Sequence, residues 1–351
     1  MVRSDNMKNK KIKIVLIGIL VIILLIVGLY FYGLTAVSRK EEKVTFVVNS
    51  GAGKRAVIDK LYESNLIKSK IASYIYITLN EDIMIQAGTY ELDRSYSTKE
   101  ILNVLNKGKV VNDVIVVTFI EGKKLTDFVK IISDKFGYSE EEILNVLNDQ
   151  EYLKELINKY EFLDDSILNS DLYYALEGYL FPASYEFYKT SSIKVIIEKM
   201  LDKTANILDN YGTSILNSGY SVHEILTIAS IIENETMFQE DRSVVSQVIK
   251  KRLALNMSLG MDVTTYYGVQ KSLSETLTKS DLENENAYNT RRTSFIGLPV
   301  GPICNPSEAS IEAALNPSRT EYIYFYADIK TGKLYFAETY SEFQGLIQKY
   351  S

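Results

Sequence analysis

The sequence predicts an α+β protein with an N-terminal transmembrane helix, a small α+β module and a larger mixed α/β domain that contains a C-terminal β-hairpin. Three observations lead to this fold class. An apolar run without charge occupies residues 14–34. A strand, a glycine turn and an amphipathic helix follow one another at residues 44–61 and again at 117–132. Near the C-terminus, two aromatic-rich runs flank Thr331-Gly332, a pattern typical of a hairpin turn.

The apolar run at 14–34 is long enough to cross a bilayer, because a helix of that length rises about 30 Å. A cleaved signal peptide is the alternative, but its apolar region should be shorter. We therefore predict an uncleaved anchor. Five basic residues precede the run, whereas three follow it beside two glutamates. The positive-inside tendency then predicts a single-pass cell-membrane protein, with a cytoplasmic tail at 1–13 and an extracytoplasmic body.

The body divides into three predicted parts. Residues 44–110 form one small module, whose last helix should begin at Ser97 or Thr98 and stop before Gly108. Residues 111–175 read as a strand followed by charged helices, which we interpret as a connecting region. Residues 176–351 form the last domain, which carries all five prolines of the chain.

Composition excludes several classes of function. Beyond residue 40 the chain has 32 basic and 44 acidic residues, a net charge of −12, which argues against binding to nucleic acid. Cys304 is the single cysteine, so no internal disulfide is possible. His223 is the single histidine, which makes a zinc site improbable because zinc prefers imidazole and thiolate ligands. We expect neither a metal nor a cofactor.

The stretch ASIIENET, residues 229–236, carries the chemistry that we consider most important. On a helical wheel, apolar residues between 225 and 232 form one broad face, and Glu233 and Glu235 lie on its two borders. A carboxyl group at such a border is partly desolvated, which raises its pKa toward the range of a general acid. Border glutamates are also commonly just solvated, and the pattern does not choose between the two. Arg242 and Arg252 are close enough in sequence for one glutamate to be ion-paired.

Several longer stretches resemble the membrane-anchored endolytic murein transglycosylases, the YceG-like family of peptidoglycan terminases. They occur in the family's order, and they are LEGYLFPASYEF (176–187), ASIIENET (229–236), KRLALNMSLGMDVTTYYG (251–268), AYNT (287–290) and GLPVGPICNPSEASIEAALNP (297–317). The resemblance implies that residues 44–110 are a LysM-like module. It also implies that residues 176–351 are a catalytic transglycosylase domain.

The resemblance assigns the catalytic role to Glu233, the first glutamate of the SIIExE motif. Glu235 would support it by orienting neighbours through an ion pair. Six further positions fall in family motifs and become candidates for substrate contact: Glu177, Tyr179, Asp262, Thr264, Tyr288 and Asn289. For each of them a structural role is the alternative, and Tyr179 and Tyr288 in particular could be core aromatics.

The family's activity is cleavage of the MurNAc–GlcNAc bond in nascent peptidoglycan strands. One carboxyl group suffices because the C6 hydroxyl of the same muramyl sugar is the nucleophile, which gives a 1,6-anhydroMurNAc end and terminates glycan elongation. The implied partners are glycan strands and the peptidoglycan synthases, with no cofactor. The chain departs from the family pattern at Gly260, where glutamine is usual, at Val263, where proline is usual, and at Leu334 and Phe343, where histidines are frequent.

Three other functions remain open at this stage. The first is a non-catalytic cell-wall-binding scaffold for peptidoglycan synthesis. The second is a lysozyme-like hydrolase, which would leave reducing ends. The third is a nucleophilic enzyme that pairs Cys304 with His223, although neither residue lies in a recognisable protease motif.

Overall fold

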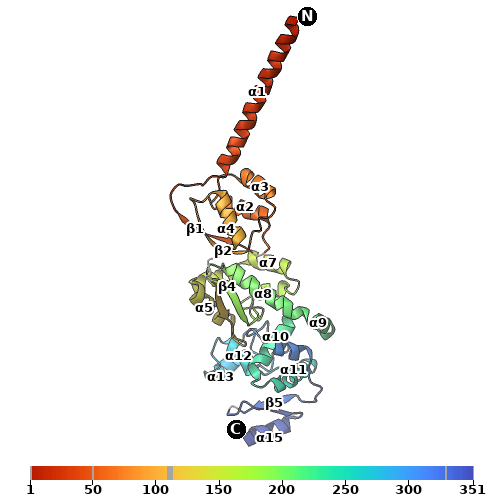
Figure 1. The fold of residues 1–351 in the computed structure, drawn as a ribbon. Coiled ribbons are helices and arrows are strands. Elements are labelled where there is room, and N and C mark those ends of the chain that lie inside the picture. The colour runs from red at the N-terminus through yellow and green to blue at the C-terminus, as the bar shows by residue number, and fades with distance from the viewer. Residues whose placement is uncertain (1, 50, 109–113, 329, 351) are drawn as a thin grey trace. The chain divides into compact units, whose positions relative to one another are not determined.

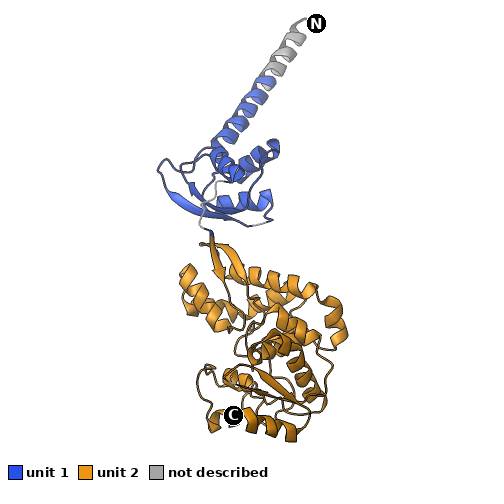
Figure 2. Ribbon diagram, turned by 60° about the horizontal axis from the view of Figure 1, so that its bottom comes forward, with its two compact units in different colours: residues 1–114 blue, residues 115–351 orange. Residues whose placement is uncertain are grey.

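The computed structural model describes residues 2–49, 51–108, 114–328 and 330–350. It is a mixed α and β protein, as predicted, and it divides into two compact units, residues 1–114 and 115–351 (Figure 2). The predicted module boundary at residue 110 lies outside the described residues, as do the side chains of the predicted tail 1–13. Each unit has its own hydrophobic core.

The first unit begins with one long helix, α1 (Val2–Gly33) (Figure 1). Within it, Leu16–Gly33 is long and apolar enough to cross a membrane, and no other helix in the described part of the chain meets that criterion. The helix ends against the module that follows it. A Cβ atom on Gly33 would lie 2.9 Å from the side chains of Ser69 and Ala72, so this close approach requires glycine.

The rest of the first unit is a pair of strands covered by helices. Its elements are β1 (Lys43–Val48), α2 (Lys54–Glu63), α3 (Lys70–Leu79), β2 (Gly88–Asp93) and α4 (Thr98–Lys107). The strands are antiparallel, with Lys43 opposite Asp93. Ser97 caps α4 by accepting a hydrogen bond from the Glu100 N–H, and Gly108 ends the helix with φ of 61°. Both predicted boundaries of this helix are therefore confirmed.

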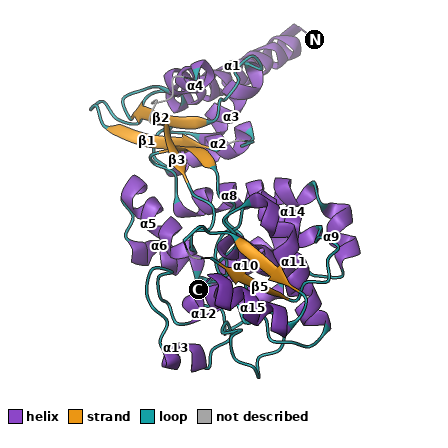
Figure 3. Cartoon of the chain, turned by 90° about the horizontal axis from the view of Figure 1, so that it is seen from below, coloured by secondary structure: helices purple, strands orange, loops and turns teal. Residues whose placement is uncertain are grey.

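The second unit is larger and mostly helical (Figure 3). Its first elements are β3 (Val114–Thr118), α5 (Leu125–Phe136), α6 (Glu140–Leu147), α7 (Gln150–Lys159), the short 3₁₀ helix η1 (Asp165–Leu168) and β4 (Ser184–Tyr188). They are followed by α8 (Ile193–Asp209), α9 (Gly212–Ser218), α10 (Val222–Glu235), α11 (Gln239–Ala254), α12 (Asp262–Gly268) and α13 (Lys279–Glu283). The last are α14 (Glu308–Leu315), β5 (Tyr324–Ala327), β6 (Leu334–Ala337) and α15 (Tyr340–Tyr350).

Two small sheets shape this unit. β3 pairs with β4, which joins chain segments on either side of α5, α6 and α7. β5 and β6 form the predicted C-terminal hairpin, with Tyr324 opposite Ala337 and with Gly332 in its turn at φ of 70°. One hydrophobic core runs from Val117 to Leu334. The region that we predicted as a connector thus shares its core with the residues that follow it.

The helix that carries the predicted catalytic motif, α10, lies in the middle of this core. It packs against α11, α12 and α14. The wheel predicted a single apolar face, but Thr227 and Ser230 are buried as well. Their hydroxyl groups donate within the helix, Thr227 to the His223 carbonyl at 2.7 Å and Ser230 to the Thr227 carbonyl at 2.8 Å. These bonds satisfy the hydroxyl protons and allow the helix to be enclosed.

Candidate active site

The proline-rich loop at 297–307 runs along α10 and brings Ser307 to the end of that helix. Two contacts fix its course, and both involve Ser230. The Ile303 N–H donates to Ser230 Oγ at 3.0 Å, and the Cys304 thiol donates to the Ser230 carbonyl at 3.4 Å. A polar residue in the middle of a buried helix therefore serves as the attachment point for the loop.

Glu233 lies where this loop meets α10 and α11. One of its carboxylate oxygens, Oε1, lies 3.2 Å from Nη2 of Arg242. The other, Oε2, accepts from the Ser307 N–H at 3.0 Å and from the Ser307 hydroxyl at 2.5 Å. The Glu233 side chain is 8% exposed, so the desolvation that we expected is present, together with three donors that hold the carboxyl group in one orientation.

A second loop, residues 119–124 between β3 and α5, covers another side of Glu233. It is held to the first loop by two backbone bonds: the Gly122 N–H donates to the Asn305 carbonyl, and the Asn305 N–H donates to the Lys123 carbonyl, both at 2.9 Å. Gly122 has φ of 72°, and a Cβ atom there would lie 3.5 Å from Cγ of Glu233. The loop therefore passes so close to Glu233 that any side chain at position 122 would touch it.

Glu177 lies beneath both loops and ties them together. Its Oε1 accepts from the Leu125 N–H at 2.8 Å and from Nδ2 of Asn305 at 3.2 Å, and its Oε2 is 3.0 Å from the Tyr267 hydroxyl. Burial raises the pKa of Glu177 to about 8, although these bonds and the charge of Lys124 oppose the rise. Glu177 is therefore largely protonated at neutral pH.

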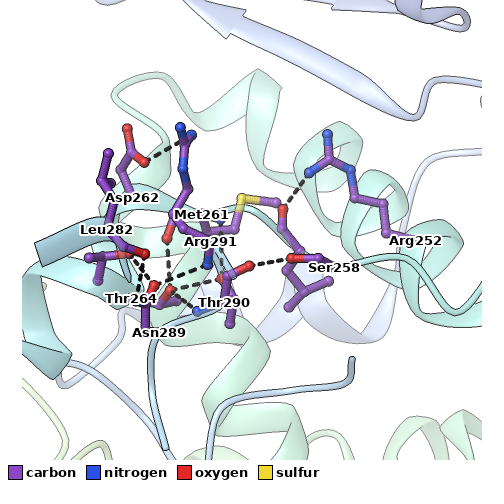
Figure 4. Close-up of polar contacts among 11 residues, drawn as sticks. Arg252, Ser258, Met261, Asp262, Thr264, Leu282, Asn289, Thr290 and Arg291 are labelled. Atoms are coloured by element: carbon purple, nitrogen blue, oxygen red, sulfur yellow. Dashed lines mark hydrogen bonds and ion pairs between the residues drawn. The ribbon is translucent and has the colours of Figure 1, made fainter. Parts of the chain in front are cut away.

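Glu235 lies in a different environment from Glu233. Burial raises the pKa of Glu235 to about 7 and the charge of Asp262 adds to this, whereas the Val263 N–H, Arg252 and Arg291 lower it. Asp262 is itself paired with Arg291 at 3.1 Å on the surface (Figure 4). Among the described residues Glu235 makes no ion pair within 4 Å, so the ion pair that we expected to orient its neighbours is absent there.

Thr264 and Asn289 are fully buried in a network of hydroxyl and amide groups (Figure 4). The Thr264 and Thr290 hydroxyls are 2.8 Å apart. Asn289 accepts from the Thr265 hydroxyl at 2.8 Å and donates to the Asn284 carbonyl, also at 2.8 Å. Their polar groups are therefore occupied by protein partners, which hold α12 against the segment after α13.

Tyr179 and Tyr288 are also internal. The Tyr179 hydroxyl lies 2.8 Å from Nδ1 of His223. Tyr288 packs in an aromatic group with Tyr173 and Tyr267, at ring-centroid distances of 5.0 and 4.7 Å. Both tyrosines are at most 1% exposed, which is the placement of core aromatics that we weighed against substrate contact.

A pocket of about 160 Å³ opens on the Arg242 side of the site. Its lining residues come from α11, from α14 and from the residue just after α14: Gln239, Arg242, Ser243, Ala309, Glu312, Ala313 and Asn316. Glu233 does not line this pocket itself. Arg242 is therefore the group that links the Glu233 carboxylate to this hollow.

Comparison with known proteins decides the family. A sequence model of the YceG-like family matches residues 46–349, which is most of the chain. The chain belongs to the YceG-like family. It is similar to the endolytic murein transglycosylase of Bacillus subtilis, with 34% identity over 93% of this chain and 91% of that protein. It is also similar to the endolytic murein transglycosylase of Streptococcus pneumoniae, with 28% identity over 86% of this chain and 57% of that longer protein.

A solved structure agrees with this YceG-like assignment. The crystal structure of a yceG-like protein from Listeria monocytogenes is 32% identical in sequence and has a TM-score of 0.63. The match covers 88% of this chain and all of that one. The family resemblance that the sequence motifs indicated is therefore confirmed, both by sequence and by fold.

The structure explains three of the departures from the YceG-like motif pattern, those at Gly260, Leu334 and Phe343. Gly260 has φ of 62°, and a Cβ atom there would lie 3.3 Å from Nη1 of Arg252, so glycine suits this backbone better than glutamine. Leu334 is 5% exposed in β6. Phe343 stacks on Tyr324 at a centroid distance of 5.5 Å. The two positions where histidines are frequent therefore serve hydrophobic packing in this YceG-like chain.

The Cys304–His223 pair is wrong as a nucleophilic site. Cys304 donates to a backbone carbonyl, and burial, followed by the charges of Glu177 and Glu233, raises the pKa of its thiol well above the usual range. His223 is occupied by Tyr179 at Nδ1 and by the Val300 carbonyl at Nε2, each at 2.8 Å. The thiol is thus neutral, and the imidazole is bound elsewhere.

Sequence analysis missed Ser307, Asn305 and Glu121, which all lie around Glu233. Asn305 lies within the motif ICNP and Ser307 follows it, but a serine before a helix is typical of an N-cap and gives no sign of a carboxylate partner. The ion pair of Arg242 with Glu233 was one of the pairings left open, and it is confirmed at 3.2 Å.

Proposed function

We propose that this protein is a membrane-anchored endolytic lytic transglycosylase with Glu233 as its catalytic acid and base. The observation that carries the proposal is the placement of Glu233: a single side chain, 8% exposed, held by Arg242 and Ser307 in a chain of the YceG-like family. The names of the Bacillus and pneumococcal relatives support a reaction on peptidoglycan. The substrate is the MurNAc–GlcNAc bond of a nascent glycan strand.

The first step is proton donation. Protonated Glu233 donates to the glycosidic oxygen that leaves, and the bond between that oxygen and C1 of the muramyl sugar breaks. The charge of the carboxylate left behind is stabilised by the guanidinium group of Arg242 and by the two donors of Ser307. These groups are in place before the reaction, so little reorganisation is needed when the charge appears.

The second step forms a new ring within the muramyl sugar. The Glu233 carboxylate removes the proton from the C6 hydroxyl, whose oxygen bonds to C1. The product is a 1,6-anhydroMurNAc end, and the glutamate is protonated again. Because attacking hydroxyl and reacting carbon belong to one sugar, the attack is intramolecular and gains a high effective concentration. One carboxyl group can therefore perform both transfers.

In this proposal the other predicted site residues differ in whether the glycan reaches them. Asp262 and Glu235 are the candidates that a glycan can reach, because Asp262 is 55% exposed and Glu235 is only partly buried. Glu177 holds the two loops beside Glu233 in place. Four buried side chains position the surrounding segments and meet substrate only if those segments open: Tyr179, Thr264, Tyr288 and Asn289.

In this proposal the first unit holds the protein at the cell membrane. We propose that Leu16–Gly33 anchors the chain in the cell membrane, with the N-terminus in the cytoplasm and both compact bodies outside. The module of β1, β2 and their helices is a LysM-like unit that binds glycan or spaces the catalytic part from the bilayer. Cutting close to the membrane terminates elongating strands, so the partners of this reaction are the peptidoglycan synthases.

The test is a product analysis. The full-length protein in detergent is incubated with nascent glycan strands, and strand ends are identified by mass spectrometry. The expected result is anhydromuramyl ends for the wild type and a loss of at least about a hundredfold for Glu233→Gln. Glu240→Gln is the matched control, since Glu240 is an exposed carboxylate in the first turn of α11. Equal anhydro product from wild type and Glu233→Gln would reject Glu233 as the catalyst.

The same experiment separates the alternatives. Reducing ends in place of anhydro ends identify a hydrolase. Strand binding without any cleavage by a folded wild-type protein identifies the non-catalytic scaffold. In that second case Glu233→Gln leaves the retention of glycan strands unchanged.

A further inference from the structure

The loop at 119–124 carries a second carboxyl group, Glu121, next to the predicted catalytic one. Both ends of this loop are fixed. The Phe119 N–H donates to the Ala183 carbonyl at 2.9 Å, and the Phe119 ring packs on Phe128 at a centroid distance of 4.8 Å. The other end is held by its backbone pair with Asn305. The position of Glu121 is therefore set by the same segments that position Glu233.

The residue next to Glu121 in the loop approaches Glu233 closely. The residue after Glu121 is Gly122, whose Cβ position is 3.5 Å from Cγ of Glu233 and 3.4 Å from Oδ1 of Asn234. Glu121 itself is exposed, and in the described part of the chain it makes no hydrogen bond or ion pair. An exposed and unpaired carboxyl group thus lies one residue from the point where the loop approaches a nearly buried one.

The charged groups that face Glu121 come from α10 and α11. Desolvation and then the charge of Glu233 raise the pKa of Glu121, and the charge of Arg242 lowers it. The Cys304 thiol, which also feels the charge of Glu233, is neutral. The charge of one guanidinium group, Arg242, therefore acts on both carboxyl groups, although it is ion-paired only with Glu233. When both are ionised the cluster has a net charge of −1, and binding one proton removes their mutual repulsion.

We propose that Glu121 is a second functional carboxyl group of the Glu233 site, which faces the sugar from the loop and shares with Glu233 the proton that cleavage uses and returns. This inference rests on the proposed transglycosylase function. A proton bound to the pair goes to the departing oxygen as the C1–O bond breaks, and a proton from the C6 hydroxyl replaces it as the new C–O bond forms. The pair ends as it began, without water or another reactant.

The contacts of Glu233 indicate why a second carboxyl group would help this site. Arg242 and the two Ser307 donors all favour the ionised form of a carboxyl group. A general acid must nevertheless begin the reaction with a proton. A neighbouring carboxylate opposes the loss of that proton, so Glu121 balances the donors on the other side of Glu233.

The experiment compares the full-length wild type with Glu121→Gln, Glu121→Asp and Glu186→Gln. Glu186 is the matched control, because it is an exposed glutamate on β4, the partner strand of β3. The rate of anhydromuramyl formation is measured from about pH 4 to pH 9, where a pair of titrating groups shapes the profile. We expect the high-pH limb of Glu121→Gln to move to lower pH by roughly half a unit to one unit. Glu121→Asp should keep the limb of the wild type, and so should Glu186→Gln.

The outcomes distinguish failure of the proposed function from failure of the shared-proton proposal. Wild type without anhydro product overturns the proposed function itself. If the wild type is active and the high-pH limb of its rate profile coincides with that of Glu121→Gln, the shared-proton proposal is wrong. This holds even if the variant is slower at every pH. A readout independent of turnover is the carboxyl-carbon NMR resonance of Glu121, assigned by its disappearance in Glu121→Gln. It should titrate at lower pH in Glu233→Gln than in the wild type, and an unchanged titration contradicts the proposal.

Discussion

Ser307 donates both its backbone N–H and its hydroxyl to the same carboxylate oxygen of Glu233, at 3.0 and 2.5 Å. The same hydroxyl oxygen accepts from the Ser310 N–H at 3.3 Å and so caps α14. One side chain thus joins the start of a helix to the predicted catalytic group. The helix cap fixes the hydroxyl, and the fixed hydroxyl orients the carboxyl group.

Ser307→Ala should separate these two roles. Loss of a hydrogen bond to a charged group costs about 1.5–3 kcal/mol, so cleavage should fall roughly tenfold to a hundredfold. Loss of the cap should lower stability by about 1 kcal/mol. The control is Ser192→Ala, because Ser192 caps α8 at the Val195 N–H and does not touch Glu233. Thermal unfolding and product analysis should show similar destabilisation for both variants and lost activity only for Ser307→Ala. Full activity in Ser307→Ala contradicts the orienting role.

Arg242→Gln should destabilise the protein and inactivate it. The Arg242 and Glu233 side chains are 16% and 8% exposed, so removal of the guanidinium group leaves a nearly buried carboxylate beside Glu121. Breaking such a pair costs about 3 kcal/mol. Arg292→Gln is the control, since its partner Glu285 is 79% exposed and surface pairs contribute little. Denaturant unfolding of the two variants measures the difference, and equal stabilities would exclude a buried ion pair at Glu233.

Glu177→Gln should change how stability depends on pH. Burial raises the pKa of Glu177 to about 8, against an ordinary value of 4.5. The folded protein therefore holds a proton that the unfolded chain has lost. The stability from this group is complete below about pH 4.5, falls as pH rises and is gone above about pH 8. Glutamine imitates the protonated form, since its oxygen can accept from Leu125 and Asn305 and its amide can donate to Tyr267.

The measurement is the unfolding midpoint of wild type and Glu177→Gln between about pH 5 and pH 8. The wild type should lose stability relative to the variant across this window, by a few kcal/mol at most. Glu186→Gln should reproduce the slope of the wild type. Parallel curves for wild type and Glu177→Gln would mean that Glu177 is ionised in the folded state.

Gly178→Ala should be far more damaging than Gly219→Ala. Both glycines have positive φ, 82° and 75°, so both substitutions carry the backbone penalty of about 1 kcal/mol. At Gly178 the added Cβ would also lie 2.4 Å from Cβ of Pro302, whereas nothing lies within 4 Å at Gly219. Pro302 belongs to the loop that delivers Ser307. We expect Gly219→Ala to fold with slightly reduced stability and Gly178→Ala to lose at least about 2 kcal/mol more, as measured by thermal unfolding. Similar midpoints would contradict the close packing of this loop.

Local patterns predicted the elements of this protein well. Ser97 and Gly108 mark the ends of α4, and Thr331-Gly332 marks the hairpin turn, because each depends on backbone geometry within a few residues. The wheel placed Glu233 at the edge of a buried helix, which the structure confirms. These signals need no knowledge of distant segments.

The wheel could not choose between Glu233 and Glu235, because the choice depends on which segments lie beside each carboxyl group. Ser307 comes from a loop far along the chain, and Glu121 comes from a loop far before α10. Family motifs made Tyr179, Thr264 and Asn289 candidates for substrate contact, with a structural role as the alternative, and their partners in the structure are internal. Tertiary packing supplies this information, and a single sequence does not display it.

The pairing of the 119–124 loop with Asn305, and of Glu233 with Ser307, also bears on when the protein becomes active during its synthesis. A chain interrupted before residue 305 has α10 and Glu233 but lacks the segment that anchors the loop and orients the acid. Under the proposed mechanism we therefore expect partly made or clipped copies to leave glycan strands intact. Cleavage should begin only after the segment around residues 305–307 has been added to the chain.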